Sequence, residues 1–227
     1  MELKKDSTVH LLFEQSGTYK EVFHELGYKA YDYDIDNQFN KTDYVIDLFN
    51  EIEKAYNHEP SIFDNIKEDD LIMSFFPCTY FSVQNELIWS RKQKQFKYYT
   101  KEQADKYVND RLATREKFFQ TLIKYIHVVK ERNLKMMFEN PYARNYLLSR
   151  KEIKQPDLII EDRSKLGDNH IKPSAFWFYN FEPTFFSQFI YKNQSQVLKH
   201  NEINGILRSQ MHKDFARNFV NKYILGI

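Results

Sequence analysis

The chain has 227 residues, of which 42 % are hydrophobic and 29 % are charged, and its formal net charge is +1. This length suits one domain of ordinary size or one with an insertion, and the apolar fraction allows a large core. A net charge so close to zero gives no global attraction to nucleic acid, so such binding needs a local patch. The single cysteine excludes an intramolecular disulfide and a cysteine-based zinc site, and we predict no metal site.

No stretch of the sequence indicates export or insertion into a membrane. The first residues, from Met1 to Asp6, are charged and lack an apolar signal region. No window approaches the roughly 20 apolar residues that a membrane-spanning helix requires. We therefore expect a cytoplasmic protein without a membrane partner, and the single cysteine agrees with a reducing compartment.

Apolar runs bounded by polar loops predict strands that alternate with helices. This alternation implies βαβ units, so the expected fold class is α/β, with a mostly parallel sheet flanked by helices. We expect a single domain over 1–227, with a helical and basic insertion at about 84–132. In chain order the pattern predicts a strand at 9–13, a helix at 18–26, strands at 29–33, 44–46 and 71–75, a helix at 101–132, strands at 135–138, 158–160 and 175–179, and a closing helix at 211–225.

Polar residues follow the ends of several predicted strands. In a parallel sheet the carboxyl ends of the strands share one edge, where ligands bind. Carboxylates there suit a ribose or an adenine amino group, because both groups donate hydrogen bonds. The residues at these ends are Glu14 to Gly17 after the first strand, Asp34 after the second, Asp47 after the third, Pro77 and Cys78 after the fourth, and Glu139 and Asn140 after the fifth.

Six segments carry these residues in a fixed order. They are LLFEQSGTYKEVF (11–23), YDYDID (31–36), VIDLF (45–49), SFFPCTYFS (74–82), MMFENP (136–141) and IKPSAFWFYN (171–180). Their order and spacing resemble the DNA (cytosine-5)-methyltransferase family, most closely its compact phage-type members. The resemblance runs from about Val9 to Tyr179, which is most of the chain.

The resemblance implies the Rossmann-like fold of S-adenosylmethionine-dependent methyltransferases and methyl transfer from S-adenosylmethionine to carbon 5 of cytosine in DNA. Cys78 would add covalently to the cytosine ring, Glu139 would supply a proton, and Asn140 would support the loop. The base would have to leave the stack to reach such a pocket. The residues implied to contact the cofactor are Phe13, Gln15, Gly17, Asp34, Ile35, Asp47 and Pro77.

The chain also departs from the family pattern. Its first loop keeps one glycine, Gly17, and has Gln15 where glycine is common, while Thr79 follows the Pro-Cys pair in place of the usual glutamine. Only Lys172 is basic where full-length members carry an arginine pair, and 181–227 leaves little or no room for a target-recognition domain. Two alternatives therefore stay open: a protein of this fold that binds cofactor or nucleic acid without turnover, and a phage or host interaction scaffold.

Several of these residues also have purely structural interpretations. A lone buried cysteine such as Cys78 is more often a core residue, although the presence of Glu139 at a neighbouring strand end favours a site. Asp34 and Asp47 could cap helices, and capping competes most strongly at Asp47, which precedes 48–56. The Asn-Pro-Tyr sequence after Glu139 is similar to the Asn-Pro-Pro-Tyr signature of amino-methyltransferases, which we rank lower because one proline is absent.

A basic and aromatic segment, WSRKQKQFKYYTK (89–101), lies between the two catalytic motifs. Cations bind phosphates and aromatic rings stack on bases, so the pattern suits nucleic acid, although a solvated loop is nearly as good an interpretation. We expect this segment on the rim beside Cys78. The partner would be DNA, duplex or single-stranded, recognised directly or with a partner protein. The predicted nucleic-acid contacts are Arg91, Lys92, Lys94, Lys97, Arg115 and Lys172.

Overall fold

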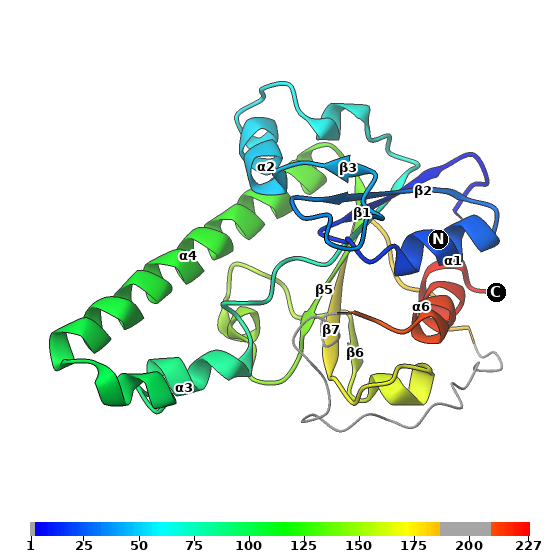
Figure 1. The fold of residues 1–227 in the computed structure, drawn as a ribbon. Helices are drawn as coiled ribbons and strands as arrows, with labels where there is room; N and C mark the ends of the chain where they lie inside the picture. Colours follow the sequence, from blue (N-terminus) through cyan, green and yellow to red (C-terminus); the bar gives the residue numbers. More distant parts are fainter. Residues whose placement is uncertain (1–2, 187–209) are drawn as a thin grey trace.

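The computed structural model describes residues 3–186 and 210–227, and within them seven strands form one sheet in the order β3-β2-β1-β4-β5-β7-β6 (Figure 1). The strands are β1 (Thr8–Leu12), β2 (Lys29–Asp34), β3 (Tyr44–Val45), β4 (Leu71–Ser74), β5 (Lys135–Pro141), β6 (Leu158–Ile160) and β7 (Ser174–Tyr179). The described helices are α1 (Thr18–Glu25), α2 (Leu48–Tyr56), α3 (Glu86–Trp89), α4 (Lys101–Glu131) and α6 (Lys213–Phe219), which continues into the π-helical η7 (Val220–Leu225). Short 3-10 turns complete the chain: η1 (Ile62–Asn65), η2 (Val83–Asn85), η3 (Lys94–Tyr98), η4 (Tyr146–Ser149) and η5 (Arg163–Leu166).

The expected α/β fold with a mostly parallel sheet is confirmed. Strands β1 to β5 run parallel, while β7 is antiparallel to both β5 and β6. The chain builds outward from β1 to β3 and then returns to place β4 and β5 on the other side of β1. This reversal of order makes a crevice at the carboxyl ends of β1 and β4, as in Rossmann-like folds.

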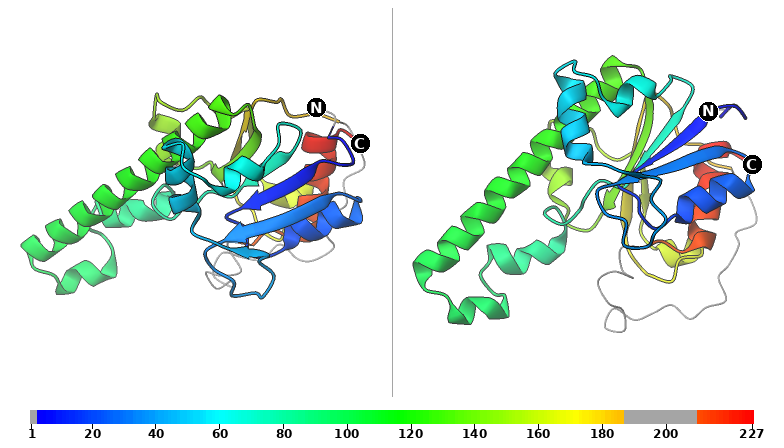
Figure 2. Two further views of the ribbon diagram at one scale, coloured as in Figure 1. Left: turned by 90° about the horizontal axis from the view of Figure 1, so that it is seen from above. Right: turned by 45° about the horizontal axis from the view of Figure 1, so that its top comes forward.

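Helices cover both faces of the sheet (Figures 1 and 2). Adjacent strand residues alternate between two cores, because side chains along a strand point to opposite faces. Ile72 packs in the core under α2 and α4, whereas its neighbours Leu71 and Met73 pack in the core under α1 and α6. Both faces of the central strands are therefore buried, which explains their continuous apolar sequences. In the described part of the chain, no helix has the combined length and hydropathy that crossing a bilayer requires.

The largest difference from the expected elements is in β5, which is longer than 135–138. Glu139 and Asn140 lie inside this strand, opposite Phe176 and Ala175 of β7. Pairing with β4 ends at Phe138, but the antiparallel β7 continues to pair as far as Pro141. The two polar residues are therefore fixed by the sheet and do not belong to a free loop.

Helix α4 and the segment before it form an arm, which we define as residues 86–115. Helix α4 has 31 residues, about 46 Å at the usual rise per residue. Its second half packs on α2 and the sheet, whereas its first half extends away from the sheet together with α3 and η3 in all three views (Figures 1 and 2). The arm lies inside the insertion expected at about 84–132.

Candidate functional site

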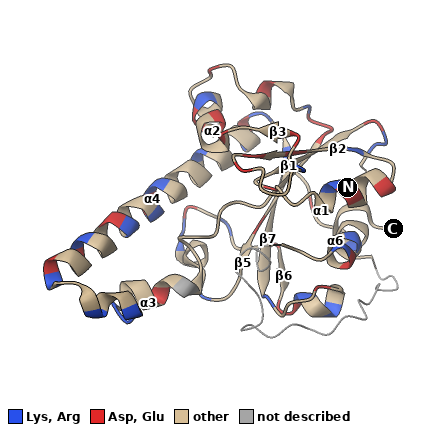
Figure 3. Cartoon of the chain, in the orientation of Figure 1, with Lys and Arg blue, Asp and Glu red and all other residues tan. Residues whose placement is uncertain are grey.

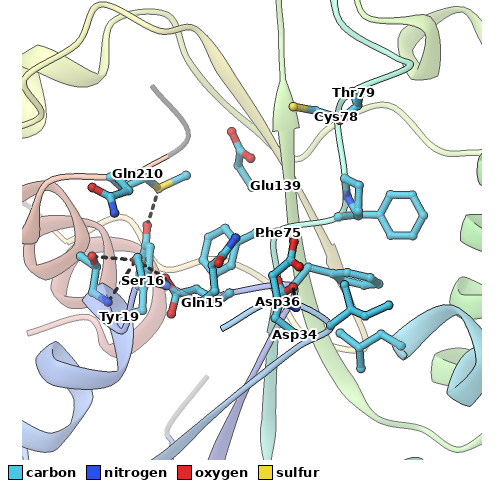
Figure 4. A pocket seen from close by; sticks show the side chains of 18 of the residues that line it. Gln15, Ser16, Tyr19, Asp34, Asp36, Phe75, Cys78, Thr79, Glu139 and Gln210 are labelled. Carbon is cyan, nitrogen blue, oxygen red and sulfur yellow. Dashed lines mark hydrogen bonds between the residues drawn. The ribbon is translucent and has the colours of Figure 1, made fainter. Parts of the chain in front are cut away.

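A cavity of about 400 Å³ opens at the carboxyl ends of the strands (Figure 4). This volume lies in the range of small-molecule sites. Nine of the predicted site residues line it: Phe13, Gln15, Asp34, Ile35, Asp47, Pro77, Cys78, Glu139 and Lys172. The remaining predicted residues, Gly17, Asn140, Arg91, Lys92, Lys94, Lys97 and Arg115, are outside its lining.

The loop after β1 begins with a strained backbone. Phe13 has φ of 59°, a left-handed conformation that bulky residues rarely adopt. Its amide donates to the Tyr33 carbonyl of β2 (2.8 Å), and its ring packs against Phe49 and Phe76, with centroids 5.7 and 5.3 Å away. The bend directs the following residues across the end of β1 and into the cavity.

The Glu14 carboxylate accepts hydrogen bonds from the backbone amides of this loop. One of its oxygens accepts from the Ser16 amide (3.0 Å) and the other from the Gly17 amide (2.9 Å). Burial raises the pKa of Glu14, and these hydrogen bonds oppose the rise. Amides at the start of such a helix hold the pyrophosphate in dinucleotide-binding folds. Here an internal carboxylate takes that place, so the loop does not suit a phosphate ligand.

Gly17 makes the turn and does not line the cavity. It caps α1 with φ of 73°, where a side chain would be strained. A Cβ atom there would lie 2.8 Å from Cδ of Lys41. Gln15, by contrast, lines the cavity, and its side-chain oxygen is buried and accepts no hydrogen bond from any described residue. The oxygen itself is closed off, so the Gln15 side chain would have to turn to offer it to a ligand in the cavity.

Two acids stand at the ends of β2 and β3. Asp34 is the last residue of β2, where burial raises its pKa, and one of its oxygens accepts from the Asp36 amide (2.9 Å). Asp47 caps α2 by accepting from the amides of Phe49 and Asn50 (3.0 and 3.2 Å). The capping interpretation of Asp47 is thus confirmed, and the same side chain also lines the cavity.

The cavity is strongly acidic. Five carboxylic acids line it, and Lys172 is the one lysine or arginine among its lining residues in the described part of the chain. Such a set attracts a cationic ligand rich in hydrogen-bond donors and repels phosphates. The five acids are Glu14, Asp34, Asp36, Asp47 and Glu139.

Cys78 follows β4, and the loop that carries it is tied to β5. The side-chain nitrogen of Asn140 donates to the Phe76 carbonyl (2.8 Å), and its oxygen accepts from Asn145 (2.9 Å). The expected support of this loop by Asn140 is therefore seen. Burial raises the pKa of the Cys78 thiol, and the positive charge of Lys172 opposes this rise. Asn140 is a positioning residue, because it does not reach the cavity itself.

Glu139 is buried in β5 and faces the cavity beside Cys78 (Figure 4). One of its oxygens accepts a hydrogen bond from the Ser174 hydroxyl on β7 (2.6 Å). This contact holds the carboxyl group in place, and its second oxygen stays available for a ligand. Sequence reasoning missed Ser174 as a partner, because the pairing of β7 with β5 brings together residues 35 positions apart.

Two residues just before α6 also line the cavity, and no chemical signal in the sequence indicated them. Gln210 and Met211 lie there, and the Tyr19 hydroxyl donates to the Met211 sulfur (3.2 Å; Figure 4). The helix at 211–225 was expected, but its position beside α1 follows from packing alone. The C-terminal part of the chain therefore completes one wall of the cavity.

The predicted basic residues of the arm lie away from the cavity, so the expected position of 89–101 beside Cys78 is not seen (Figures 1 and 3). Arg91 forms an ion pair with Asp105 of α4. The Arg115 guanidinium lies against the rings of Trp89 (4.9 Å) and Tyr146 (4.0 Å). Burial lowers the pKa of Arg115, and its contacts hold α3 against the body of the protein.

A buried charge cluster beside the first loop has a measurable pH dependence. Asp32 on β2 is fully buried 3.0 Å from the Lys20 ammonium, and burial raises its pKa to about 7. A carboxyl group with a raised pKa binds its proton more tightly in the folded state. Its contribution to stability is therefore full at acidic pH and is lost as the pH rises toward 7.

We expect the free energy of unfolding to fall between pH 5 and pH 8, with Asp32 contributing about 3 kcal/mol of the fall. Asp32→Asn should remove this part, as measured by urea unfolding at the two pH values. Asp69→Asn is the control, because Asp69 is exposed and its pKa is lowered by Lys4. An equal fall in the wild-type protein and Asp32→Asn would contradict the assignment.

Comparison of the sequence with models of known protein families, and with curated proteins, gave no match.

Proposed function

We propose that the chain is an S-adenosylmethionine-dependent methyltransferase that acts on carbon 5 of cytosine in DNA. The observation that carries the proposal is the shared cavity. A cysteine and a buried carboxyl group line it together with the acid-bearing ends of β2 and β3. The motif order in the sequence supports the same conclusion.

The lining residues fit S-adenosylmethionine. Its sulfonium and ammonium groups are positive, which suits the five acids of the cavity. Asp34 would accept from the ribose hydroxyls, and the Gln15 side chain would turn to offer its oxygen to the ammonium group. The exposed Ile35 and the Asp47 carboxylate would lie at the adenine ring and its amino group. The loop amides held by Glu14 disfavour a dinucleotide, which carries phosphates at this position.

The catalytic residues would act on a cytosine turned out of the helix. When bound, S-adenosylmethionine supplies a methyl group on a positively charged sulfur. The Cys78 thiolate adds to carbon 6 of the ring, and Glu139 donates a proton at ring nitrogen 3, so carbon 5 becomes nucleophilic. Carbon 5 would take the methyl group as the bond from that group to the cofactor sulfur breaks, which leaves the cofactor as a neutral thioether. A base would then remove the proton from carbon 5, and the Cys78 thiolate would leave carbon 6. Glu139 returns to its acid form when ring nitrogen 3 gives back its proton.

The test is transfer of labelled methyl groups from S-adenosylmethionine to duplex and single-stranded DNA of varied sequence, with the label located by nucleoside analysis. We expect 5-methylcytosine. Cofactor binding without transfer to any of these DNAs would favour the alternative of a binding protein without turnover. Absence of cofactor binding in calorimetry would contradict the proposal at its first step.

A matched pair of variants tests the placement of the cofactor. Asp34→Asn should weaken S-adenosylmethionine binding about 10- to 100-fold, because it removes a charged acceptor at the end of β2. Asp36→Asn removes the same charge from an exposed position on the rim and should change the affinity less than about threefold. Equal losses in the two variants would mean that the overall charge of the cavity matters and that Asp34 makes no specific contact.

A further inference from the structure

The outer end of the arm carries more positive than negative charge, with the acids Glu102 and Asp105 beside the lysines at the start of α4. Residues 87–101 contain five lysines and arginines and no acid. Arg91 is paired with Asp105, but the other four, all exposed, form no ion pair with a residue in the described part of the chain. These four are Lys92, Lys94, Lys97 and Lys101, and we call residues 92–101 the arm tip (Figure 3).

The aromatic residues of the same segment divide into two groups. Phe96 and Tyr99 pack on Tyr107 of α4, with centroids 5.8 and 6.0 Å away, so they hold η3 against the helix. Trp89 covers Arg115. Tyr98 is different, because 86 % of it is exposed. The arm tip therefore exposes the ammonium groups of its four lysines, which are unpaired among the described residues, and the ring of Tyr98. Packed aromatic side chains hold the segment in place.

The arm is linked to the loop that carries Cys78. Arg115 of α4 contacts Tyr146, whose amide donates to the Phe81 carbonyl three residues after Cys78 (3.0 Å). From Arg115 to Lys101 the helix extends about 21 Å further out. The rise of B-DNA is about 3.4 Å per base pair, so this length corresponds to about six base pairs.

We propose that the arm tip binds the phosphate backbone of DNA outside the stretch that holds the base at the cavity, with α4 from Arg115 to Lys101 spanning the length of about six base pairs. Lys92, Lys94, Lys97 and Lys101 contact phosphates, and the Tyr98 ring lies against the sugar or base edge beside them. Through this surface the protein would contact phosphates of the duplex that lie beyond the body of the protein. Its place relative to the target base rests on the proposed function, whereas phosphate binding by the tip does not.

The test compares two triple variants in fluorescence anisotropy with a labelled 30-base-pair duplex at several salt concentrations, without cofactor. In the tip variant, Lys92, Lys94 and Lys97 are each changed to Gln. We expect at least about tenfold weaker binding and a salt slope smaller by about three, because each phosphate contact contributes close to one. In the control variant, Lys29, Lys67 and Lys130 are each changed to Gln. These exposed lysines lie close to the starts of β2, β4 and β5, at the opposite edge of the sheet.

The control variant should bind within about twofold of the wild-type protein with an unchanged salt slope. Equal behaviour of the two variants, or an unchanged slope in the tip variant, would overturn the proposal. A second measurement locates the tip: methyl transfer by the tip variant should fall on the 30-base-pair duplex but not on one of 8 base pairs with a central target. If the wild-type protein transfers no methyl group but the tip variant still loses affinity, the proposed function fails and the arm-tip proposal stands.

Discussion

Cys78→Ala is expected to lower the rate of methyl transfer at least about 10³-fold, equivalent to about 4 kcal/mol in the activation free energy. Carbon 5 of cytosine is a weak nucleophile until a thiolate has added to carbon 6, so no neighbouring group replaces the sulfur. The affinity for S-adenosylmethionine should stay within about twofold, because the substitution removes a single uncharged atom from a large cavity. Single-turnover transfer and calorimetry measure the two quantities.

A covalent trap tests the role of Cys78 as nucleophile without a rate measurement. DNA with 5-fluorocytosine at the target has no proton to lose from carbon 5 after methylation, so the Cys78 adduct should accumulate in the wild-type protein. Cys78→Ala should give no adduct on a denaturing gel. Thr79→Ala, at the exposed next position, should still form it. Methyl transfer by Cys78→Ala at more than a tenth of the wild-type rate would exclude Cys78 as the nucleophile.

The protonation of the Cys78 thiol predicts how the rate of adduct formation depends on pH. Because burial raises the pKa of Cys78, the thiolate fraction is small at neutral pH and grows as the pH rises. The rate of adduct formation should therefore increase from pH 7 toward pH 9. The positive charge of Lys172, and to a smaller extent that of Arg163, opposes the rise in the pKa of Cys78.

Glu139→Gln is expected to lower the rate of methyl transfer about 10²- to 10⁴-fold, the usual contribution of a positioned acid. Glutamine has the same shape, and its side-chain oxygen still accepts from the Ser174 hydroxyl, so the geometry is preserved while the transferable proton is lost. Thermal unfolding and cofactor affinity should match the wild-type protein. The measurement is the single-turnover rate at saturating cofactor and DNA.

Ser174→Ala is the matched control for this variant. It removes the hydroxyl that holds one oxygen of Glu139 but leaves the acid in place, so the rate should fall about tenfold at most. If Ser174→Ala were as slow as Glu139→Gln, orientation of the carboxyl group would be its main contribution. A Glu139→Gln protein that keeps more than a tenth of the wild-type rate would remove Glu139 from the proton transfer.

The sequence predicted the central sheet well, because buried parallel strands have continuous apolar runs. Strands at 9–13 and 71–75 match β1 and β4 to within one residue. The strand at 135–138 was too short, since polar residues such as Glu139 and Asn140 end an apolar run even where β7 keeps pairing with them. Strand ends read from hydrophobicity alone miss such residues.

The site was predictable where the chemistry lies at strand ends and unpredictable where packing brings distant segments together. Asp34 ends β2 and Cys78 comes after β4, so a parallel sheet places both at one edge. Met211 reaches the cavity only because α6 packs beside α1. In the arm, composition could not distinguish Tyr98 from Tyr99, because exposure depends on which ring meets Tyr107.

The hydrogen bond from Asn140 to the Phe76 carbonyl has a mechanical consequence for Glu139 and Cys78, the two proposed reacting groups. Glu139 is the proposed acid, and the next residue of the same strand holds the Phe76 carbonyl, two residues before Cys78. A shift of β5 along its axis would therefore displace acid and nucleophile together and preserve their separation.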